Sequence, residues 1–404
     1  MGEAWRQVVA KDLIDSPVVV VDAESTVEDA CDLLLSKDLA CLAVNSRHNS
    51  SPHGVPYHGL FDYADVNAFL TLAATRHRIS AEELREKPRI REILAAAKAG
   101  RVPVYLVSDL SEKNPLEILP HDATLVSLLG VFARGTHRVL IQSPPPSSEY
   151  LGMVSDRRLL AWFTAYAQET PSLLRFLSVP LSSLALPSLY LYMTVVAAKA
   201  SDSVLDAMKL MSDEGVSSVA VVDDETGNLL SAVSVTDIGK IVVPAQSNQI
   251  LSTVLQQLVS RIKERDGSTD GADKFPVYSV SPSNTLFYTM QKLLATNSHR
   301  LFVTEESPMS SSSNFNPGSS GSLCGIVSTV DVLSLFARMA NLPDVDPKRM
   351  QRHRRASSTS SQSSGSWSSG DFGRSRSSSR TSLQRMSASM TNLDSFQWAE
   401  RVQK

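Results

Sequence analysis

Amphipathic stretches alternate with short β-branched runs through the first 340 residues of the chain. A representative segment begins with Val204–Met211, whose apolar residues recur at the spacing of one helix face. Two apolar runs follow, Val216–Val222 and Leu229–Val235, and the polar turn Asp223–Gly227 between them is typical of a strand pair. A second amphipathic stretch closes the segment. The pattern therefore predicts a helix, two strands and a helix, preceded by a further short strand.

This pattern recurs, and the recurrences are related in sequence. Residues 25–44 align with residues 202–221 at a constant offset of 177 positions, sharing a Val, an Asp-Ala pair, a Leu and an Ala-Val pair. His137–Leu140 similarly matches His299–Phe302 as His-Arg-apolar-apolar. The first unit thus resembles the third and the second resembles the fourth, as in a duplicated pair. We place the units at residues 9–72, 115–168, 192–246 and 275–340.

The segments between the units have their own character. Ala81–Ala99 is predicted to be a connecting helix, and Ser260–Asp273 a charged linker before unit four. Within unit four, Ser307–Gly321 is a Ser-, Asn- and Gly-rich insertion between two strands. Residues 347–404 are rich in Ser and Arg and poor in apolar residues. Such a segment cannot bury enough surface to offset its ordering entropy, so we predict a disordered tail.

A seven-residue frame lies where the last strand of each unit meets its last helix. It reads small residue, two apolar residues, hydroxyl or acid, two variable residues, and then Asp in three of the four copies. The copies are Gly59–Asp65, Gly152–Arg158, Ser231–Asp237 and Gly325–Asp331. A hydroxyl and a helix N-terminus can donate to phosphate, and a carboxylate can accept from both ribose hydroxyls. The frame is therefore typical of a nucleotide-binding corner.

Each position of the frame receives a predicted role. The ribose acceptors are Asp65, Asp237 and Asp331, and the phosphate-facing hydroxyls are Ser155, Ser234 and Ser328. Unit one carries Asp62 in place of the hydroxyl, which would repel a phosphate, and unit two carries Arg158 in place of the ribose acceptor. We therefore expect units three and four to hold a nucleotide. The alternative is that each Asp simply caps its helix without any ligand.

Charge separates the body of the chain from its tail. The net charge is -3, yet residues 348–404 hold eleven Lys or Arg against three Asp or Glu. Ser357, Ser375 and Ser377 lie next to Arg and are predicted phosphorylation sites, unless the tail is simply an unmodified solubilising segment. Eight net charges without elements that read bases would give only non-specific, salt-sensitive affinity, so the sequence argues against nucleic-acid binding. Three unpaired cysteines fit a reducing compartment, and no apolar run is long enough to span a membrane.

The frame, at the end of a β-α-β-β-α unit, resembles the CBS domain. Four such units in two tandem pairs resemble the gamma subunit of AMP-activated protein kinase. That resemblance implies an α/β (α+β) fold in which two pairs form a pseudo-symmetric disc. It also implies AMP, ADP or ATP as regulatory ligands without any obligatory cofactor. By the same resemblance His137, Arg138, His299 and Arg300 reach nucleotide phosphates, and the unit with Arg158 stays empty or uses this arginine on a neighbouring ligand.

The basic Ser-rich tail and the insertion in unit four are more similar to the fungal Sds/Moc family of four-CBS proteins. That resemblance implies phosphatase inhibition, roles in cell separation, DNA replication and the response to nutrients or stress, and residence in cytoplasm and nucleus. The partner would be a protein phosphatase or a protein kinase.

No nucleophile elbow, HExxH motif or Cys pair with zinc spacing occurs, so we predict neither an enzyme nor a metal site. Two alternatives stay open beside the regulator. One is a gamma-type subunit of an AMP-activated kinase heterotrimer, and the other is a structural hub with ligand-free sites.

Overall fold

The computed structural model describes residues 3–46, 56–147, 149–184, 195–243, 248–266, 277–305 and 322–343, with positions 186, 188, 189 and 345. The predicted insertion at Ser307–Gly321, the tail at 347–404 and its candidate phosphorylation sites lie outside these residues.

Each unit consists of a short strand, a helix, two longer strands and a second helix. Unit one contains β1 (Val20–Val21), α1 (Val27–Ser36), β2 (Cys41–Asn45), β3 (Tyr57–Asp62) and α2 (Tyr63–Thr75). Unit two contains β4 (Ile118–Pro120), α5 (Leu125–Phe132), β5 (Arg138–Gln142), β6 (Tyr150–Ser155) and α6 (Asp156–Glu169). Unit three contains β7 (Ala197–Lys199), α8 (Val204–Asp213), β8 (Ser218–Val222), β9 (Leu229–Ser234) and α9 (Val235–Val242). Unit four contains β10 (Ser279–Val280), α11 (Leu286–Ala295), β11 (Arg300–Glu305), β12 (Ser322–Ser328) and α12 (Thr329–Met339).

The strands of each unit form a separate three-stranded sheet in chain order. The first strand runs parallel to the second, because the first helix carries the chain back across the sheet. The second and third strands are antiparallel and carry a register shift near the loop that connects them. This topology brings the end of the third strand next to the start of the second, so Ser234 lies opposite Ser218. The frame therefore lies at the same sheet corner in every unit.

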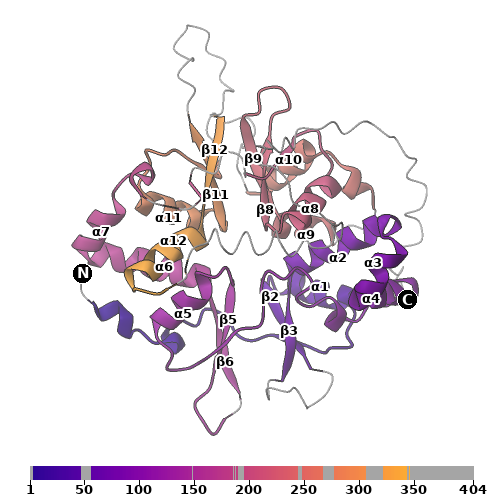
Figure 1. Ribbon diagram of the computed structural model, residues 1–404, viewed down its shortest axis with the longest axis horizontal. Coiled ribbons are helices and arrows are strands. Elements are labelled where there is room, and N and C mark those ends of the chain that lie inside the picture. The colour runs from indigo at the N-terminus through magenta and orange to yellow at the C-terminus, as the bar shows by residue number, and fades with distance from the viewer. Residues whose placement is uncertain are drawn as a thin grey trace, which may run out of the picture.

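The sheets pack against each other within each tandem pair. Cys41 and Leu60 of unit one share a buried cluster with Leu140 and Met153 of unit two. The corresponding cluster of the second pair joins Ala220 of β8 and Leu229 of β9 to Phe302 of β11. The sheets consequently occupy the middle of the molecule, the first pair below and the second pair above in Figure 1.

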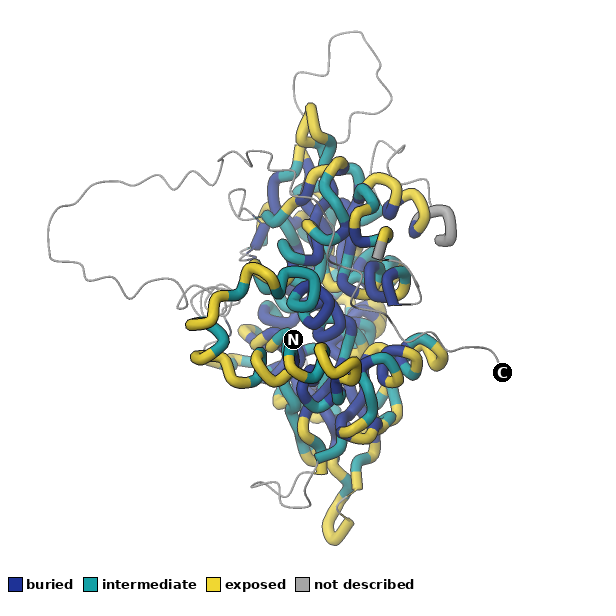
Figure 2. The backbone as a smooth tube through the Cα atoms, turned by 90° about the vertical axis from the view of Figure 1, so that its right-hand side faces the viewer, coloured by how far each residue is buried: buried dark blue, intermediate teal, exposed yellow. Residues whose placement is uncertain are grey.

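The helices pack across the two pairs, so that unit one meets unit three and unit two meets unit four. In Figure 1 the helices of units one and three lie on the right, and those of units two and four lie on the left. The ring of Phe163 stacks on that of Phe336 with centroids 3.9 Å apart. On the other side Gly239 of α9 lies so close to the ring of Tyr63 that a Cβ would overlap it. Figure 2 shows the buried backbone concentrated in the interior, with exposed segments at the periphery. The predicted α/β fold of CBS repeats in two pairs is confirmed.

Further helices lie before and between these sets of strands and helices. They are η1 (Glu3–Gln7), η2 (Ala10–Leu13), η3 (Arg76–Arg78), α3 (Ala81–Glu86), α4 (Pro88–Lys98), η4 (Val104–Leu106), α7 (Pro171–Leu177), η5 (Leu181–Ser183), η6 (Asn248–Ser252) and α10 (Leu255–Asp266).

Two connector predictions were wrong in detail. The single helix expected over Ala81–Ala99 is broken at Lys87, because Pro88 cannot continue a helix but fits the first turn of a new one. The linker expected over Ser260–Asp273 begins inside α10, which starts at Leu255. The charged residues obscured one apolar face of this helix, whose buried members are Leu255, Leu258, Val259 and Ile262.

Candidate functional site

The hydroxyl or acid of each frame is the N-cap of the following helix. The side-chain oxygen of Ser155 accepts from the backbone N–H of Arg158 at 3.0 Å, and that of Ser234 accepts from Asp237 at 3.1 Å. Ser328 accepts from Asp331 at 3.2 Å, and Asp62 replaces the hydroxyl in the same role. Helix capping alone is therefore sufficient to explain this position.

The frame's Asp closes a capping box in units one, three and four. Asp237 Oδ2 accepts from the backbone N–H of Ser234 at 2.9 Å and from its hydroxyl at 2.7 Å. Asp331 Oδ2 makes the same two bonds to Ser328, at 2.9 and 2.6 Å. Asp65 Oδ2 accepts from the N–H of Asp62 at 3.2 Å. One carboxylate oxygen is thus used locally in each copy, and the contacts of the other oxygen distinguish the units.

In unit one the corner is filled by the segment after η4. Asp65 Oδ1 accepts from the backbone N–H of Ser111 at 2.9 Å, and Oδ2 also accepts from that of Asp109 at 3.3 Å. Burial raises the pKa of Asp65 well above its usual range, and the charge of Asp62 raises it further. A ribose here would have to displace backbone donors from a buried carboxylate.

In unit four the corner is filled by the linker between the pairs. The hydroxyl of Ser188 donates to Asp331 Oδ1 at 2.8 Å, and its carbonyl accepts from the N–H of Ile326 at 3.2 Å. Asp331 is fully buried, which raises its pKa, while the hydrogen bonds from Ser328 and Ser188 oppose that rise. Both oxygens of the predicted ribose acceptor are therefore in use.

In unit two the corner is covered by the segment that precedes β1, which runs along β6. The N–H of Asp15 donates to the carbonyl of Met153 at 3.0 Å, and the N–H of Met153 donates to that of Ser16 at 2.8 Å. The hydroxyl of Ser155 donates to the carboxylate of Asp15. Arg158 contributes its backbone N–H to the helix cap, and its guanidinium provides no ribose acceptor. An acid from the same chain thus stands where a phosphate would meet Ser155.

Unit three differs from the other three. Asp237 is half-buried, and no described residue donates a hydrogen bond to its Oδ1. In units one, two and four the covering segment is the one that precedes the first strand of the other unit of the pair. For unit three that segment would be residues 267–276, which lie outside the described residues.

The two His-Arg pairs lie at the starts of β5 and β11, opposite the frame. Arg138 pairs with Ser155 and Arg300 with Ser328 in the strand registers. The positive charge of Arg300 is close enough to lower the pKa of Asp331, although burial outweighs it. The expectation that these pairs reach nucleotide phosphates stays a prediction.

His137 and His299 meet on an acid that the sequence reading did not single out. The Nδ1 atoms of the two rings lie 2.8 and 3.5 Å from Asp156 Oδ2, and the ring centroids are 4.4 Å apart. Asp156 directly follows the frame's hydroxyl, a place where the other units have Tyr63, Val235 and Thr329. This departure of unit two from its sister units was a signal in the sequence that could have found it.

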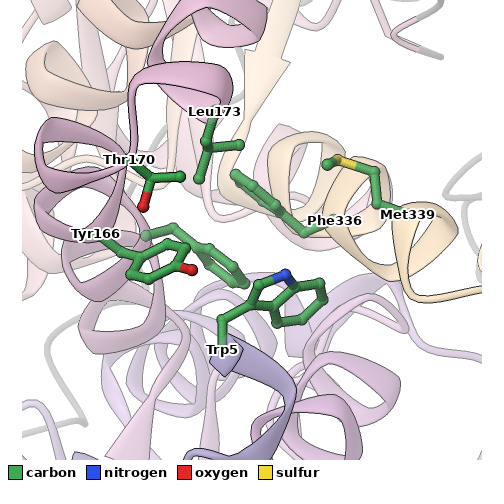
Figure 3. A pocket seen from close by; sticks show the side chains of 7 residues that line it. Trp5, Tyr166, Thr170, Leu173, Phe336 and Met339 are labelled. Atoms are coloured by element: carbon green, nitrogen blue, oxygen red, sulfur yellow. The ribbon is translucent and has the colours of Figure 1, made fainter. Parts of the chain in front are cut away.

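An apolar cavity lies elsewhere, between η1, α6, α7 and α12 (Figure 3). Trp5 and Phe336 both contact the ring of Phe163, with centroid distances of 5.5 and 3.9 Å. The cavity volume of ≈ 10 Å³ is close to the ~10–15 Å³ that one water needs, so it cannot hold a nucleotide. Among the described residues no helix is long and apolar enough to cross a membrane.

The comparisons with known proteins agree with this architecture. The CBS domain model matches residues 10–55 and 192–243, within units one and three. Protein sds23 of Aspergillus niger is 30% identical over 89% of this chain and 78% of its own length. The chain belongs to the Sds23 family. Protein SDS23 of Yarrowia lipolytica is 32% identical over 87% of this chain and 70% of its own length.

Solved structures place the Sds23-family chain in the same fold group. One is the crystal structure of protein MJ1225 from Methanocaldococcus jannaschii, a protein described as an archaeal homolog of g-AMPK. The two folds superpose over 81% of this chain and the whole of that protein. The TM-score is 0.55 and the identity is 14%, which establishes the shared fold alone. This chain is therefore a CBS-domain regulatory protein of the Sds23 family with the architecture of paired CBS repeats.

Proposed function

We propose that this protein is a non-catalytic regulator that binds an adenine nucleotide at the Ser234–Asp237 corner of unit three. The proposal rests on the burial and hydrogen bonding of the Asp237 carboxylate. It is half-buried, one oxygen is fixed by the helix cap, and the other has no hydrogen-bond donor among the described residues. The matching acids in units one and four are buried and fully bonded.

This corner offers the groups that a nucleotide needs. A carboxylate accepts from two vicinal hydroxyls, so Asp237 can bind the ribose. The N-terminus of α9 favours a phosphate, and the Ser234 hydroxyl can donate to it once it gives up its bond to Asp237. Arg300 belongs to unit four, whose sheet packs on that of unit three, and adds positive charge to the same pair. The chemistry of the pair therefore suits AMP, ADP or ATP without any obligatory cofactor.

The regulatory output would pass to a protein phosphatase or a protein kinase. A nucleotide changes such a partner only if it binds two states of the protein with different affinity. The cross-packing of unit three on unit one, through α9 and α2, offers one route by which the corner can influence the rest of the molecule. Roles in cell separation and DNA replication, and residence in cytoplasm and nucleus, stay predictions from the fungal family.

A second function is favoured by a specific observation, the filling of three corners by the chain itself. A structural hub that has lost its ligands would show this, since Ser111, Asp15 and Ser188 satisfy the polar groups that a nucleotide would otherwise bind. The hub predicts that no adenine nucleotide binds at any concentration near the physiological range.

Calorimetric titration of the full chain with AMP, ADP and ATP distinguishes the nucleotide-binding regulator from the structural hub. We expect Asp237→Ala to weaken binding at least about tenfold, which corresponds to about 1.4 kcal/mol. The matched control is Asp206→Ala, because Asp206 closes the same type of capping box on α8 of the same unit. Equal effects of the two substitutions would show that Asp237 acts only on the helix. The absence of binding by all three nucleotides to the unaltered protein would favour the hub.

A further inference from the structure

Three side chains from two units converge where unit two meets unit four. His137 precedes β5, Asp156 begins α6, and His299 precedes β11. Their positions are fixed by the backbone, because the N–H of Asp156 donates to the carbonyl of His137 at 3.0 Å and the N–H of Thr329 donates to that of His299 at 2.9 Å. One potential ligand atom from each of the three lies within 4.8 Å of the other two. The cluster is therefore built by folding from residues 19 and 143 positions apart in the sequence.

The acid in this cluster has an unsatisfied oxygen. The side chain of Asp156 is 1% exposed, and its Oδ2 faces the Nδ1 atoms of both rings. Its Oδ1 is buried and has no hydrogen-bond partner within the described part of the chain. A buried carboxylate oxygen without a partner is costly, so a cation that both oxygens of Asp156 bind would satisfy a group that the protein leaves open.

The ligand types suit a cation of the zinc class. A carboxylate oxygen and imidazole nitrogens are common ligands of Zn²⁺.

We propose that the Nδ1 atoms of His137 and His299 and the carboxylate of Asp156 bind one divalent transition-metal cation of the Zn²⁺ class. With ligand bonds of about 2.0–2.2 Å, neighbouring ligands of a tetrahedral ion lie about 3.3–3.5 Å apart. The separations of 2.8 and 3.5 Å from Asp156 Oδ2 bracket that distance, so a small ring movement is enough. Three protein ligands leave a fourth position for solvent, and the 45% exposed side chain of His299 provides the entry side.

Such an ion would join two units far apart in the chain. Two of its ligands come from unit two and one from unit four, so its binding would stabilise the packing of α6 against α11 and α12. The site does not depend on nucleotide binding at unit three, and each proposal can fail alone.

The sequence predicted no metal site, because spacing rules find ligands that are neighbours along the chain. The competing interpretation of the cluster is a hydrogen-bond network in which both rings donate Nδ1–H to Asp156. Such a network binds no metal. The two interpretations therefore predict different numbers of bound metal ions per chain, one for the metal site and none for the network.

The test uses the full chain without a histidine tag, stripped by a chelator and titrated with Zn²⁺ by calorimetry in the absence of nucleotide. We expect one equivalent to bind, with an affinity at least tenfold weaker in His299→Ala. The control is His77→Ala, since His77 is exposed on η3 outside the cluster and should leave binding unchanged. Binding should weaken in acid, because protons compete with the metal for its ligands.

A second readout keeps the proposal testable if a variant folds poorly. Co²⁺ should give visible absorption bands of a four-coordinate ion in the unaltered protein and in His77→Ala, and not in Asp156→Asn, which preserves the shape of the side chain. Circular dichroism establishes that each variant is folded. No stoichiometric uptake by the unaltered protein, or full uptake by folded His299→Ala, would overturn the proposal.

Discussion

The two tandem pairs share a fold but treat the same frame differently. In the first pair, Asp65 is bonded to the backbone of Ser111, and Ser155 is bonded to Asp15. In the second pair, Asp331 is bonded to Ser188, whereas Asp237 is bonded only to its own helix cap among the described residues. The difference teaches that a nucleotide-binding motif does not establish an available site. Whether a corner is open to a ligand depends on the segment that lies over it, and this segment comes from outside the unit.

The acid content sharpens the contrast. In the first pair the fold brings four acidic side chains to the frame corners. They are Asp15, Asp62, Asp65 and Asp109. The corners of the second pair carry one Asp and one Ser each, with Arg300 nearby. Like charges near a phosphate are repulsive, so the second pair is better suited to an anionic ligand.

The largest expected effect on stability tests whether the linker between the pairs is held over the corner of unit four. Gly325→Ala would place a Cβ against the backbone of Leu189, which cannot move aside like a flexible side chain. We expect the free energy of unfolding to fall by about 1–3 kcal/mol, measured by urea denaturation. Gly59→Ala is the matched control, since the nearest atom to its Cβ would be the Ser108 hydroxyl at 3.4 Å. Equal losses in the two variants would show that the linker is not held tightly at Gly325.

A smaller effect is expected at Ser188, and it bears on both stability and binding. Ser188→Ala removes the donor to the buried Asp331 Oδ1, which should cost about 1–2 kcal/mol. It also frees the corner of unit four, so calorimetry should find a second equivalent of AMP. Ser183→Ala is the control, because this exposed hydroxyl bonds only to the nearby carbonyl of Pro180. An unchanged stoichiometry of folded Ser188→Ala would contradict the role of Ser188 as the group that closes this corner.

The smallest effect concerns the acids of the first pair. Burial raises the pKa of Asp109 to about 6, against the opposing charge of Arg89. Because the folded-state pKa is the higher one, the stability that Asp109 contributes is complete below about pH 4 and is lost as the pH rises to about 6. Asp109→Asn should therefore raise the free energy of unfolding at pH 7 by about 1 kcal/mol, after allowing for partial exposure.

The pH profile provides the check on that prediction. The gain in Asp109→Asn should disappear in urea denaturation below about pH 4, where both side chains are neutral. The left-handed backbone at this residue, with φ of 54°, is tolerated by Asn, so the substitution adds no backbone strain. The exposed Asp122→Asn is the control and should change little at either pH. A gain that is the same at all pH values would point to a cause other than the carboxyl charge.

Local patterns predicted the units well because each element depends on residues close to it in sequence. The capping boxes of Ser234 with Asp237 and of Ser328 with Asp331 need only four consecutive residues. The apolar face of α10 is equally local, and it was missed only because charged residues from Ser260 onward dominated the composition. The assignment of roles in the frame was less secure, since capping and ribose binding require the same side chains.

The repeat, the order of strands and helices, and the position of every frame at a sheet corner could be predicted from local sequence patterns. The tertiary structure decided which corners are filled, which units pack through their helices, and that His137, Asp156 and His299 meet. The physical reason is that the first group depends on hydrogen bonds and periodicity over a few residues. The second depends on contacts between residues far apart in the sequence, such as Asp65 with Ser111 and Asp331 with Ser188, whose pairing no local pattern encodes.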